Sequence, residues 1–168
     1  MLKNSYFFVG PSKMIKKQLG VFAKRNYNKK ELLFIIKGPI LKNRTRGSFS
    51  VDLNHHIDPL KNGKKDFGYY TNHSCNPNAF ISIIDKSYRK PHIEVIARRK
   101  IKKGKEITID YASFEYETTI DNSRCGCGQK VCRGKIFGFK NLPYKIKEKY
   151  KKEGIVPDYL IELDAENI

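Results

Sequence analysis

Tryptophan is absent from the 168-residue sequence, and methionine and cysteine are scarce, with two and four residues. No apolar run approaches the roughly 18 residues that a membrane-spanning helix needs, so the sequence predicts no such helix. The apolar patch at 6–9 is too short for the apolar region of a secretory signal peptide. We therefore expect an intracellular protein, in which structural disulfides are uncommon.

Acidic residues are also scarce: 17 Asp and Glu stand against 34 Lys and Arg, giving a formal net charge of +17. Such a charge is typical of proteins that contact nucleic acid or another acidic partner. The basic residues are scattered along the chain, however, and no element that reads a base sequence accompanies them. Two interpretations stay open: non-specific contact with nucleic acid, or a composition bias without a partner.

The four cysteines are spaced as ligands of one metal ion. Cys125, Cys127 and Cys132 form a CxCx4C cluster, and Cys75 lies well upstream of them. Structural zinc prefers four thiolate or imidazole ligands in a closed tetrahedron. Two disulfides or four unrelated thiols are the alternatives, but a single residue between Cys125 and Cys127 suits a shared metal better. We therefore predict one structural zinc bound by all four cysteines.

Short apolar runs separated by Gly, Pro and Asn predict a mainly β fold for a chain that is 39% hydrophobic. The predicted strands are 21–23, 31–36, 48–53, 79–84, 92–97 and 106–111. Residues 85–91 predict a hairpin connection between the fourth and fifth strands. No amphipathic helix of more than ~12 residues is evident before residue 140, which argues against a helix-wound parallel sheet. A helix is predicted only at 142–150.

Three motifs follow one another along the chain. They are NHSCNPN at 72–78, GKEITIDY at 104–111, and CGCG with the following CRG at 125–134. Together they resemble the SET-domain protein lysine methyltransferases, and the last is similar to that family's post-SET zinc segment. Residues 18–23 are similar to the family's first cofactor strand, so the resemblance covers about residues 12–140.

The resemblance implies a SET fold of small curled β-sheets with a C-terminal pseudoknot. It places a SET domain at 12–113 and a zinc-bound post-SET flap at 114–140. Residues 141–168 would then form a short C-terminal segment that is partly helical and docks on the body.

The resemblance also implies the activity, which is methyl transfer from S-adenosylmethionine to the ε-amine of a lysine in a protein. Tyr111 matches the family's catalytic tyrosine. The residues expected at the cofactor are Gln18, Leu19, Gly20, Tyr69, Asn72 and His73. The residues expected along the substrate channel are Phe49, Tyr70 and Ile109. Asp110 is expected to support the crossing of the two motif segments.

Two positions carry further expectations. Gln18 stands where the family usually has a glycine, whose missing side chain lets backbone approach a ligand closely. Ile109 stands two residues before Tyr111, where family members with a tyrosine tend to stop after one methyl group. Ile109 has no hydroxyl to hold a water in the amine pocket, so it predicts dimethylation or trimethylation.

The substrate and the alternatives complete the expectations. Histones are common targets of the family, and a ribosomal protein or chromatin, whose DNA supplies negative charge, also suits a basic enzyme. Location is then cytoplasmic, or nuclear in a eukaryotic cell. The alternative function is a catalytically inactive SET-fold module that binds protein or nucleic acid. Retention of Asn72, His73 and Tyr111 favours the enzyme.

Overall fold

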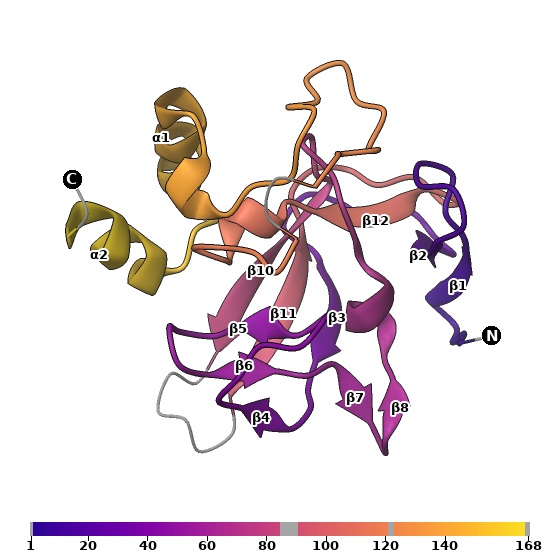
Figure 1. Ribbon diagram of the computed structural model, residues 1–168. Helices are drawn as coiled ribbons and strands as arrows, with labels where there is room; N and C mark the ends of the chain where they lie inside the picture. The colour runs from indigo at the N-terminus through magenta and orange to yellow at the C-terminus, as the bar shows by residue number, and fades with distance from the viewer. Residues whose placement is uncertain (1, 85–90, 121–122, 167–168) are drawn as a thin grey trace.

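The computed structural model describes residues 2–84, 91–120 and 123–166. Figure 1 shows a body of short strands with two helices together at one side. The strands are β1 (Phe7–Pro11), β2 (Leu19–Ala23), β3 (Leu32–Ile36), β4 (Ile40–Leu41), β5 (Phe49–Ser50), β6 (His56–Ile57), β7 (Leu60–Lys61), β8 (Lys64–Lys65), β9 (Asn72–His73), β10 (Ala79–Ile84), β11 (His92–Ala97) and β12 (Glu106–Ile109). The helices are α1 (Tyr144–Glu153) and α2 (Asp158–Glu166), with 3₁₀ turns η1 (Phe67–Tyr70), η2 (Tyr111–Ser113) and η3 (Phe139–Asn141).

The strands form four small sheets within the described residues, in the orders β1-β2-β12-β9, β10-β11-β3, β4-β6-β5 and β7-β8. Alternation along the strands decides which side chains enter the core. In β11, for example, Ile93, Val95 and Ala97 are fully buried and the intervening residues are not. The predicted mainly β class is confirmed.

Two predicted strands match the structure along their full length. β10 and β11 occupy 79–84 and 92–97 and pair antiparallel, with Ala79 opposite Ala97 and Ile84 opposite His92. The hairpin connection predicted at 85–91 lies, except for Pro91, outside the described residues.

Two predicted strands are shorter than expected. Only Phe49–Ser50 of the run at 48–53 is a strand, because the Asp52 carboxylate accepts the N–H groups of Asn54 and His55 and turns the chain. β12 ends at Ile109, because the next residue, Asp110, accepts the N–H of Ala112 and caps η2.

The main core is built around a strand that the sequence did not predict. β1 pairs antiparallel with β2 along its length, and its Phe7 is 1% exposed. The Phe7 ring stacks on Tyr27 and meets Phe34 and Phe67 edge to face, with ring centres 5.3 to 5.8 Å apart. These aromatic contacts join the first two sheets to η1 and so fix the turn that precedes the 72–78 motif.

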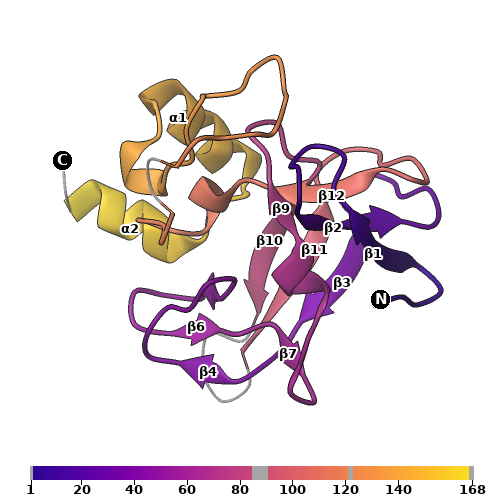
Figure 2. The same cartoon turned by 45° about the vertical axis from the view of Figure 1, so that its right-hand side comes forward.

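A parallel pairing joins two of the sequence motifs. β9 and β12 lie side by side, with Thr108 opposite Asn72 and Ile109 opposite His73 (Figure 2). The Asn78 side chain strengthens the crossing, since it donates to the Glu106 carbonyl at 2.8 Å and accepts the Thr108 N–H at 2.9 Å. The segments 72–78 and 106–111 therefore cross as the resemblance implies.

The C-terminal helices dock on the body through a second apolar cluster. Its buried members are Ala112, Phe139, Leu142, Tyr150, Ile155, Val156 and Leu160. The Tyr159 hydroxyl donates to the Phe114 carbonyl, which pins α2 beside η2. The helix predicted at 142–150 is confirmed as α1, and it ends where Gly154 adopts a left-handed φ of 65°.

A search of the described residues for a helix long and apolar enough to cross a membrane found none.

The docking of α2 predicts a large cost for Leu160→Ala. Leu160 is fully buried, so we expect the free energy of unfolding to fall by about 2–4 kcal/mol. Tyr144→Ala is the control, because Tyr144 is 75% exposed on α1 and should change stability by less than about 0.5 kcal/mol. Urea unfolding of both variants measures this. Equal stability of Leu160→Ala and wild type would mean that α2 is not docked in solution.

Candidate active site and metal centre

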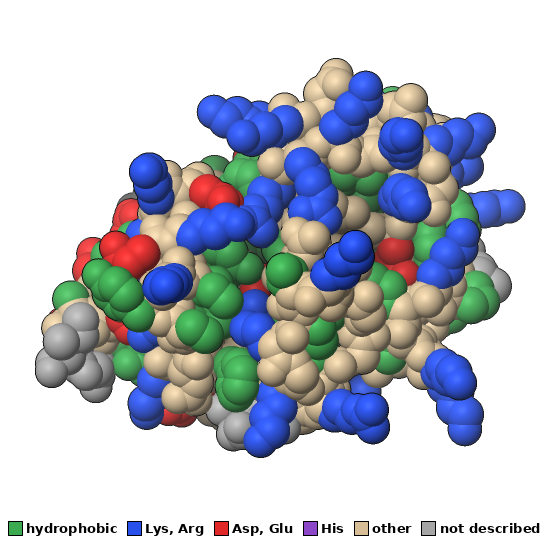
Figure 3. Space-filling model, turned by 90° about the horizontal axis from the view of Figure 1, so that it is seen from above, with side chains coloured by type: hydrophobic (Ala, Val, Ile, Leu, Met, Phe, Trp, Pro, Cys, Tyr) green, Lys and Arg blue, Asp and Glu red, His purple; other side chains and the backbone are tan. Residues whose placement is uncertain are grey.

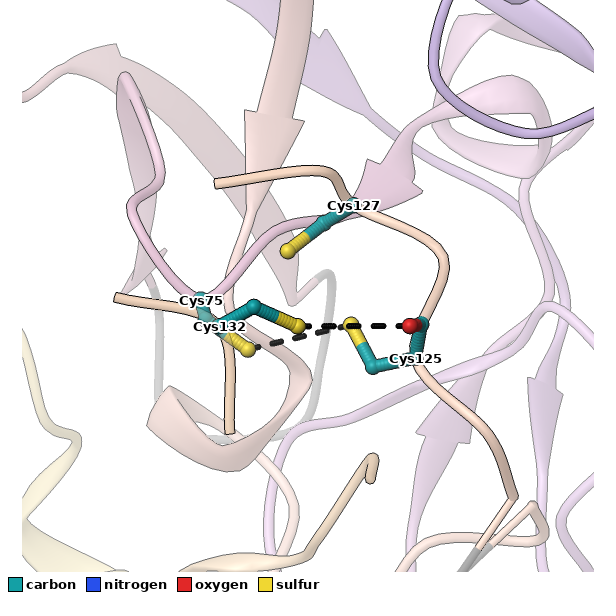
Figure 4. A group of neighbouring side chains, drawn as sticks. All are labelled: Cys75, Cys125, Cys127 and Cys132. Carbon is teal, nitrogen blue, oxygen red and sulfur yellow. Dashed lines mark hydrogen bonds between the residues drawn. The ribbon is translucent and has the colours of Figure 1, made fainter. Parts of the chain in front are cut away.

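The four cysteine side chains converge on one point (Figure 4). Their sulfur atoms all lie within 4.8 Å of one another, and Cys75 Sγ is 3.7 Å from Cys125 Sγ. A tetrahedral zinc ion with Zn–S bonds of about 2.3 Å would hold its sulfur atoms about 3.8 Å apart. The spacing fits four thiolates around one metal ion, so the ligand set expected from the sequence comes together.

Two backbone N–H groups point at sulfur atoms of this cluster. Arg133 N lies 3.4 Å from Cys75 Sγ, and Gly134 N lies 3.4 Å from Cys132 Sγ. Burial nevertheless raises the pKa of the Cys75 thiol to about 11. Thiolates gathered in such a place need a cation, and metal binding supplies one as it displaces the thiol protons.

Two cavities lie beside the 72–78 motif. The first, of about 260 Å³, has Phe49, Tyr69, Tyr70 and Phe114 in its wall. The second, of about 250 Å³, is walled by His73 and by parts of the flap that include Cys125 and Cys127. Five residues line both cavities: Gln18, Arg46, Asn72, Tyr111 and Ile120. The two cavities therefore meet at Tyr111.

Tyr111 is held in place from several sides. Its hydroxyl donates to the Thr71 carbonyl at 3.2 Å, and its ring meets those of His73 and Phe114 edge to face. Burial raises the pKa of the Tyr111 phenol, and the nearby Glu115 carboxylate raises it further. The hydroxyl therefore stays protonated at neutral pH and provides a polar group where the two cavities meet.

His73 is neutral and links the metal cluster to Tyr111. Burial lowers the pKa of His73 to about 4, although the neighbouring Asp110 opposes this. The backbone N–H of Tyr111 donates to His73 Nδ1 at 3.3 Å, so the ring proton belongs on Nε2. His73 Nε2 lies 3.4 Å from Cys75 Sγ, which accepts that proton as a weak hydrogen bond.

Strand β2 is packed against a buried carboxylate. The Asn72 amide donates to the Leu19 carbonyl at 2.9 Å and to Glu106 Oε1 at 2.8 Å. Ser12 Oγ also donates to Glu106 at 3.0 Å. A Cβ on Gly20 would lie 2.2 Å from Glu106 Oε1, so Gly20 is needed for packing of the strand and lies outside both cavity walls.

Asp110 lies at the centre of a buried network. Arg133 Nη1 and Nη2 donate to its two carboxylate oxygens at 2.7 and 2.8 Å. The Tyr150 hydroxyl donates to Asp110 Oδ2 at 2.8 Å. Asp110 is fully buried and thus joins the flap, α1 and the start of η2, in line with the structural role expected for it. Arg133 and Tyr150 were not expected from the sequence, because only the folded chain brings them to Asp110.

Glu115 is a further residue of the site, and no sequence motif identifies it. It is 8% exposed, lines the first cavity with Tyr111, and pairs with Arg44 Nη1 at 3.5 Å. Burial raises the pKa of the Glu115 carboxyl to about 7, against the opposing effect of Arg44. A carboxyl group in this cavity can therefore exist in both protonation states near neutral pH.

The other site residues expected from the sequence either line the first cavity or lie outside both cavity walls. Gln18, Tyr69, Asn72, Phe49 and Tyr70 line the first cavity, as does Leu19. Ile109 is fully buried and is not among the residues in either cavity wall.

Comparison with known proteins gives one family throughout. Residues 18–112 match the model of the SET domain family. Histone-lysine N-methyltransferase set-2 of Caenorhabditis elegans is 41% identical over 51% of this chain, and the match covers 5% of the worm protein. The H3 lysine-4 specific histone-lysine N-methyltransferase of Schizosaccharomyces pombe is 30% identical over 74% of this chain and 14% of the yeast protein. The chain thus spans a small part of these relatives.

A solved structure gives the same fold. The crystal structure of a Plasmodium falciparum protein assigned as a histone methyltransferase superposes with a TM-score of 0.51. It is 24% identical, and the match covers 64% of this chain and 93% of that one. Because the family model spans more than half of its residues, and because the sheets and the cysteine cluster agree with it, this chain belongs to the SET-domain family.

Proposed function

We propose that this chain is an S-adenosylmethionine-dependent protein-lysine N-methyltransferase. The observation that carries the proposal is the position of Tyr111, on the wall that two cavities share. Methyl transfer joins two reactants in line, so the enzyme needs two compartments that open onto one point. The SET family and its histone-lysine methyltransferase relatives support the same reaction.

The second cavity and the strand beside it are our candidates for the cofactor side. Asn72 and His73 are buried and fixed by hydrogen bonds to neighbouring segments, and Gln18 reaches both cavities. S-adenosylmethionine would supply a methyl group on a sulfonium centre. Gly20 and Glu106 would keep the strand close to Asn72, and Gln18 would take the place of the usual glycine without blocking the cavity.

The first cavity is our candidate for the lysine channel. Phe49, Tyr70 and Phe114 give it aromatic walls. An ammonium group that enters such walls loses water, which lowers its pKa and favours the neutral amine. Tyr111 and Thr71 both line this cavity, and the Tyr111 hydroxyl and the Thr71 carbonyl would orient the amine there.

We propose a histone, or another lysine-bearing protein that lies close to nucleic acid, as the substrate. The relatives named above act on histones according to their names. Figure 3 shows Lys and Arg side chains spread over the face seen from above, with no single patch. Non-specific attraction to DNA would place such a surface on chromatin, and the location would then be nuclear.

The first prediction under this proposal concerns Tyr111→Phe. The loss of one hydroxyl should slow methyl transfer by two or more orders of magnitude, equivalent to about 3 kcal/mol in the barrier. Binding of S-adenosylmethionine, measured by calorimetry, should change little. Tyr116→Phe is the control, because Tyr116 packs in the second apolar cluster outside both cavities.

Transfer is assayed on core histones and on a cell lysate. Wild-type protein that binds S-adenosylmethionine but methylates neither would favour the inactive binding module. A Tyr111→Phe variant as fast as wild type would mean that another residue orients the amine.

We also propose that the metal is zinc and that it orders the flap against residues 12–113. The second prediction is therefore one zinc per chain and its loss in Cys127→Ser. Transfer should fall at least tenfold, because Ile120 and Ile136 of the flap line the second cavity. The main core should remain folded, since Phe114 is the only described flap residue among its buried members. Val131→Ala, at a site that is 63% exposed, is the control.

Metal analysis and a methyl-transfer assay on the same samples measure both effects. Fully active, reduced protein without zinc would contradict the role of the metal.

The third prediction is that more than one methyl group is added to each lysine. Ile109, which is buried two residues before Tyr111, has no hydroxyl, so it would hold no water in the amine pocket against a second methyl group. Mass spectrometry of histones after exhaustive reaction should detect dimethyl-lysine or trimethyl-lysine. A product that halts at one methyl group, with active enzyme and excess cofactor, would contradict this prediction.

A further inference from the structure

Glu115 is a buried carboxylate to which the proposed reaction has so far assigned no role. Its side chain is 10% exposed and faces the first cavity, which is the proposed lysine channel. The backbone on both sides fixes it: its N–H donates to the Tyr111 carbonyl at 3.0 Å, and its carbonyl accepts the Phe139 N–H at 2.7 Å. The carboxylate is therefore held near Tyr111 by both η2 and η3.

The groups around Glu115 satisfy only part of the hydrogen-bonding and charge-pairing capacity of its carboxylate. Its ion pair within the described residues is with Arg44, at 3.5 Å and through one nitrogen, on a side chain that is 31% exposed. The phenols of Tyr111 and Tyr159 lie near enough for the Glu115 charge to raise the pKa of each. Arg46, on the wall of both cavities, opposes that effect at Tyr111. A buried carboxylate with one long ion pair has room to bind another cation.

The substrate that enters this cavity is itself a cation. A free lysine has a pKa of about 10.4 and arrives as an ammonium ion, which must lose a proton before its nitrogen can accept a methyl group. A base whose own pKa lies near the working pH is well placed to take that proton. Burial puts the pKa of Glu115 at about 7, so part of the population is ionised at neutral pH.

We propose that Glu115 binds the substrate ammonium in the lysine channel and accepts its proton. This inference rests on the proposed function. In the step, one N–H bond of the ammonium breaks and one O–H bond forms on the Glu115 carboxylate. The products are a neutral amine, with its lone pair free for methyl transfer, and a neutral carboxylic acid. The acid returns its proton to water when the channel opens, which readies it for another ammonium or methylammonium group.

The first test compares pH profiles of methyl transfer to core histones for wild type and Glu115→Gln. The wild-type rate should rise with pH through about 7, because the ionised carboxylate is the active form. Glu115→Gln should instead rise steadily with the fraction of neutral lysine amine, without levelling off above pH 7, and be about 100-fold slower at pH 7.5. The difference should narrow toward pH 10, where free lysine amine becomes abundant. A variant that is slower by one constant factor at every pH has lost structure only, and that result would overturn the proposal.

Two further variants sharpen the pH test. Arg44 lowers the pKa of Glu115, so Arg44→Met should move the rise to higher pH. Glu117→Gln is the matched control, because Glu117 is an exposed carboxylate two residues away that pairs with Lys140 at 2.8 Å. It should leave the profile unchanged. An unmoved profile in Arg44→Met would contradict the assignment of the rise to Glu115.

A binding measurement separates this inference from the proposed function, since it needs no turnover. n-Butylamine at pH 8, followed by NMR, imitates the lysine side chain as an ammonium ion. It should bind wild type at least tenfold more tightly than Glu115→Gln, whereas neutral n-butanol should bind both alike. Equal binding of n-butylamine to both proteins would overturn the inference even if methyl transfer is observed. If wild type transfers no methyl group, the proposed function fails, and this measurement alone decides whether Glu115 binds an ammonium ion.

Discussion

The carboxylate of Asp110 is the point on which the site depends, because it joins three segments that are distant in sequence. It is fully buried and accepts two hydrogen bonds from Arg133 in the flap and one from Tyr150 in α1. Removing one partner of a buried ion pair leaves an uncompensated charge, which typically costs about 3–5 kcal/mol. The flap and the C-terminal helices are therefore tied by charge, as well as by apolar contact, to the residue that precedes Tyr111. A displacement of the flap or of α1 would therefore be transmitted through the Asp110 side chain to the neighbouring Tyr111.

The metal cluster is connected to the same point through a second route. Cys75 lies in the 72–78 motif, and its sulfur faces both the backbone N–H of Arg133 and the ring of His73. His73 in turn accepts the backbone N–H of Tyr111. A cation among the cysteines would thus hold Cys75 as a thiolate, strengthen its hydrogen bond from His73 and fix the His73 tautomer. The cysteine cluster, the proposed cofactor side and Tyr111 are thus joined by hydrogen bonds, and Cys125 and Cys127 of the cluster line the second cavity.

Local patterns in the sequence were enough for part of this structure. The four cysteines could be grouped because their spacing suits the ligands of one metal ion, and Gly128 and Gly134 beside them adopt left-handed φ of 63° and 76°. β10 and β11 could be placed because their residues alternate. By contrast, β1 is a short edge strand whose role depends on contacts with β2. The partners of Asp110 and the burial of Glu115 likewise arise from contacts across long sequence separations, which no local pattern records. For Ile109, sequence position suggests a substrate-channel residue; the side chain is fully buried in the main core and lines neither cavity, so its role in the channel stays a prediction.

The buried carboxylates differ in how completely the fold satisfies them, and the difference follows their position. Glu106 accepts hydrogen bonds from Ser12, Lys13 and Asn72 and packs against Gly20 of β2. Asp110 has a two-nitrogen ion pair and a phenol. Among the described residues, Glu115 has one ion pair, at 3.5 Å, and it lines a cavity. Native proteins pair their buried charges fully where the need is structural, and exceptions gather at sites where a ligand completes the pairing. Glu106 and Asp110, whose carboxylates are well paired, therefore stabilise the fold, whereas Glu115 lies where a substrate cation would complete the pairing.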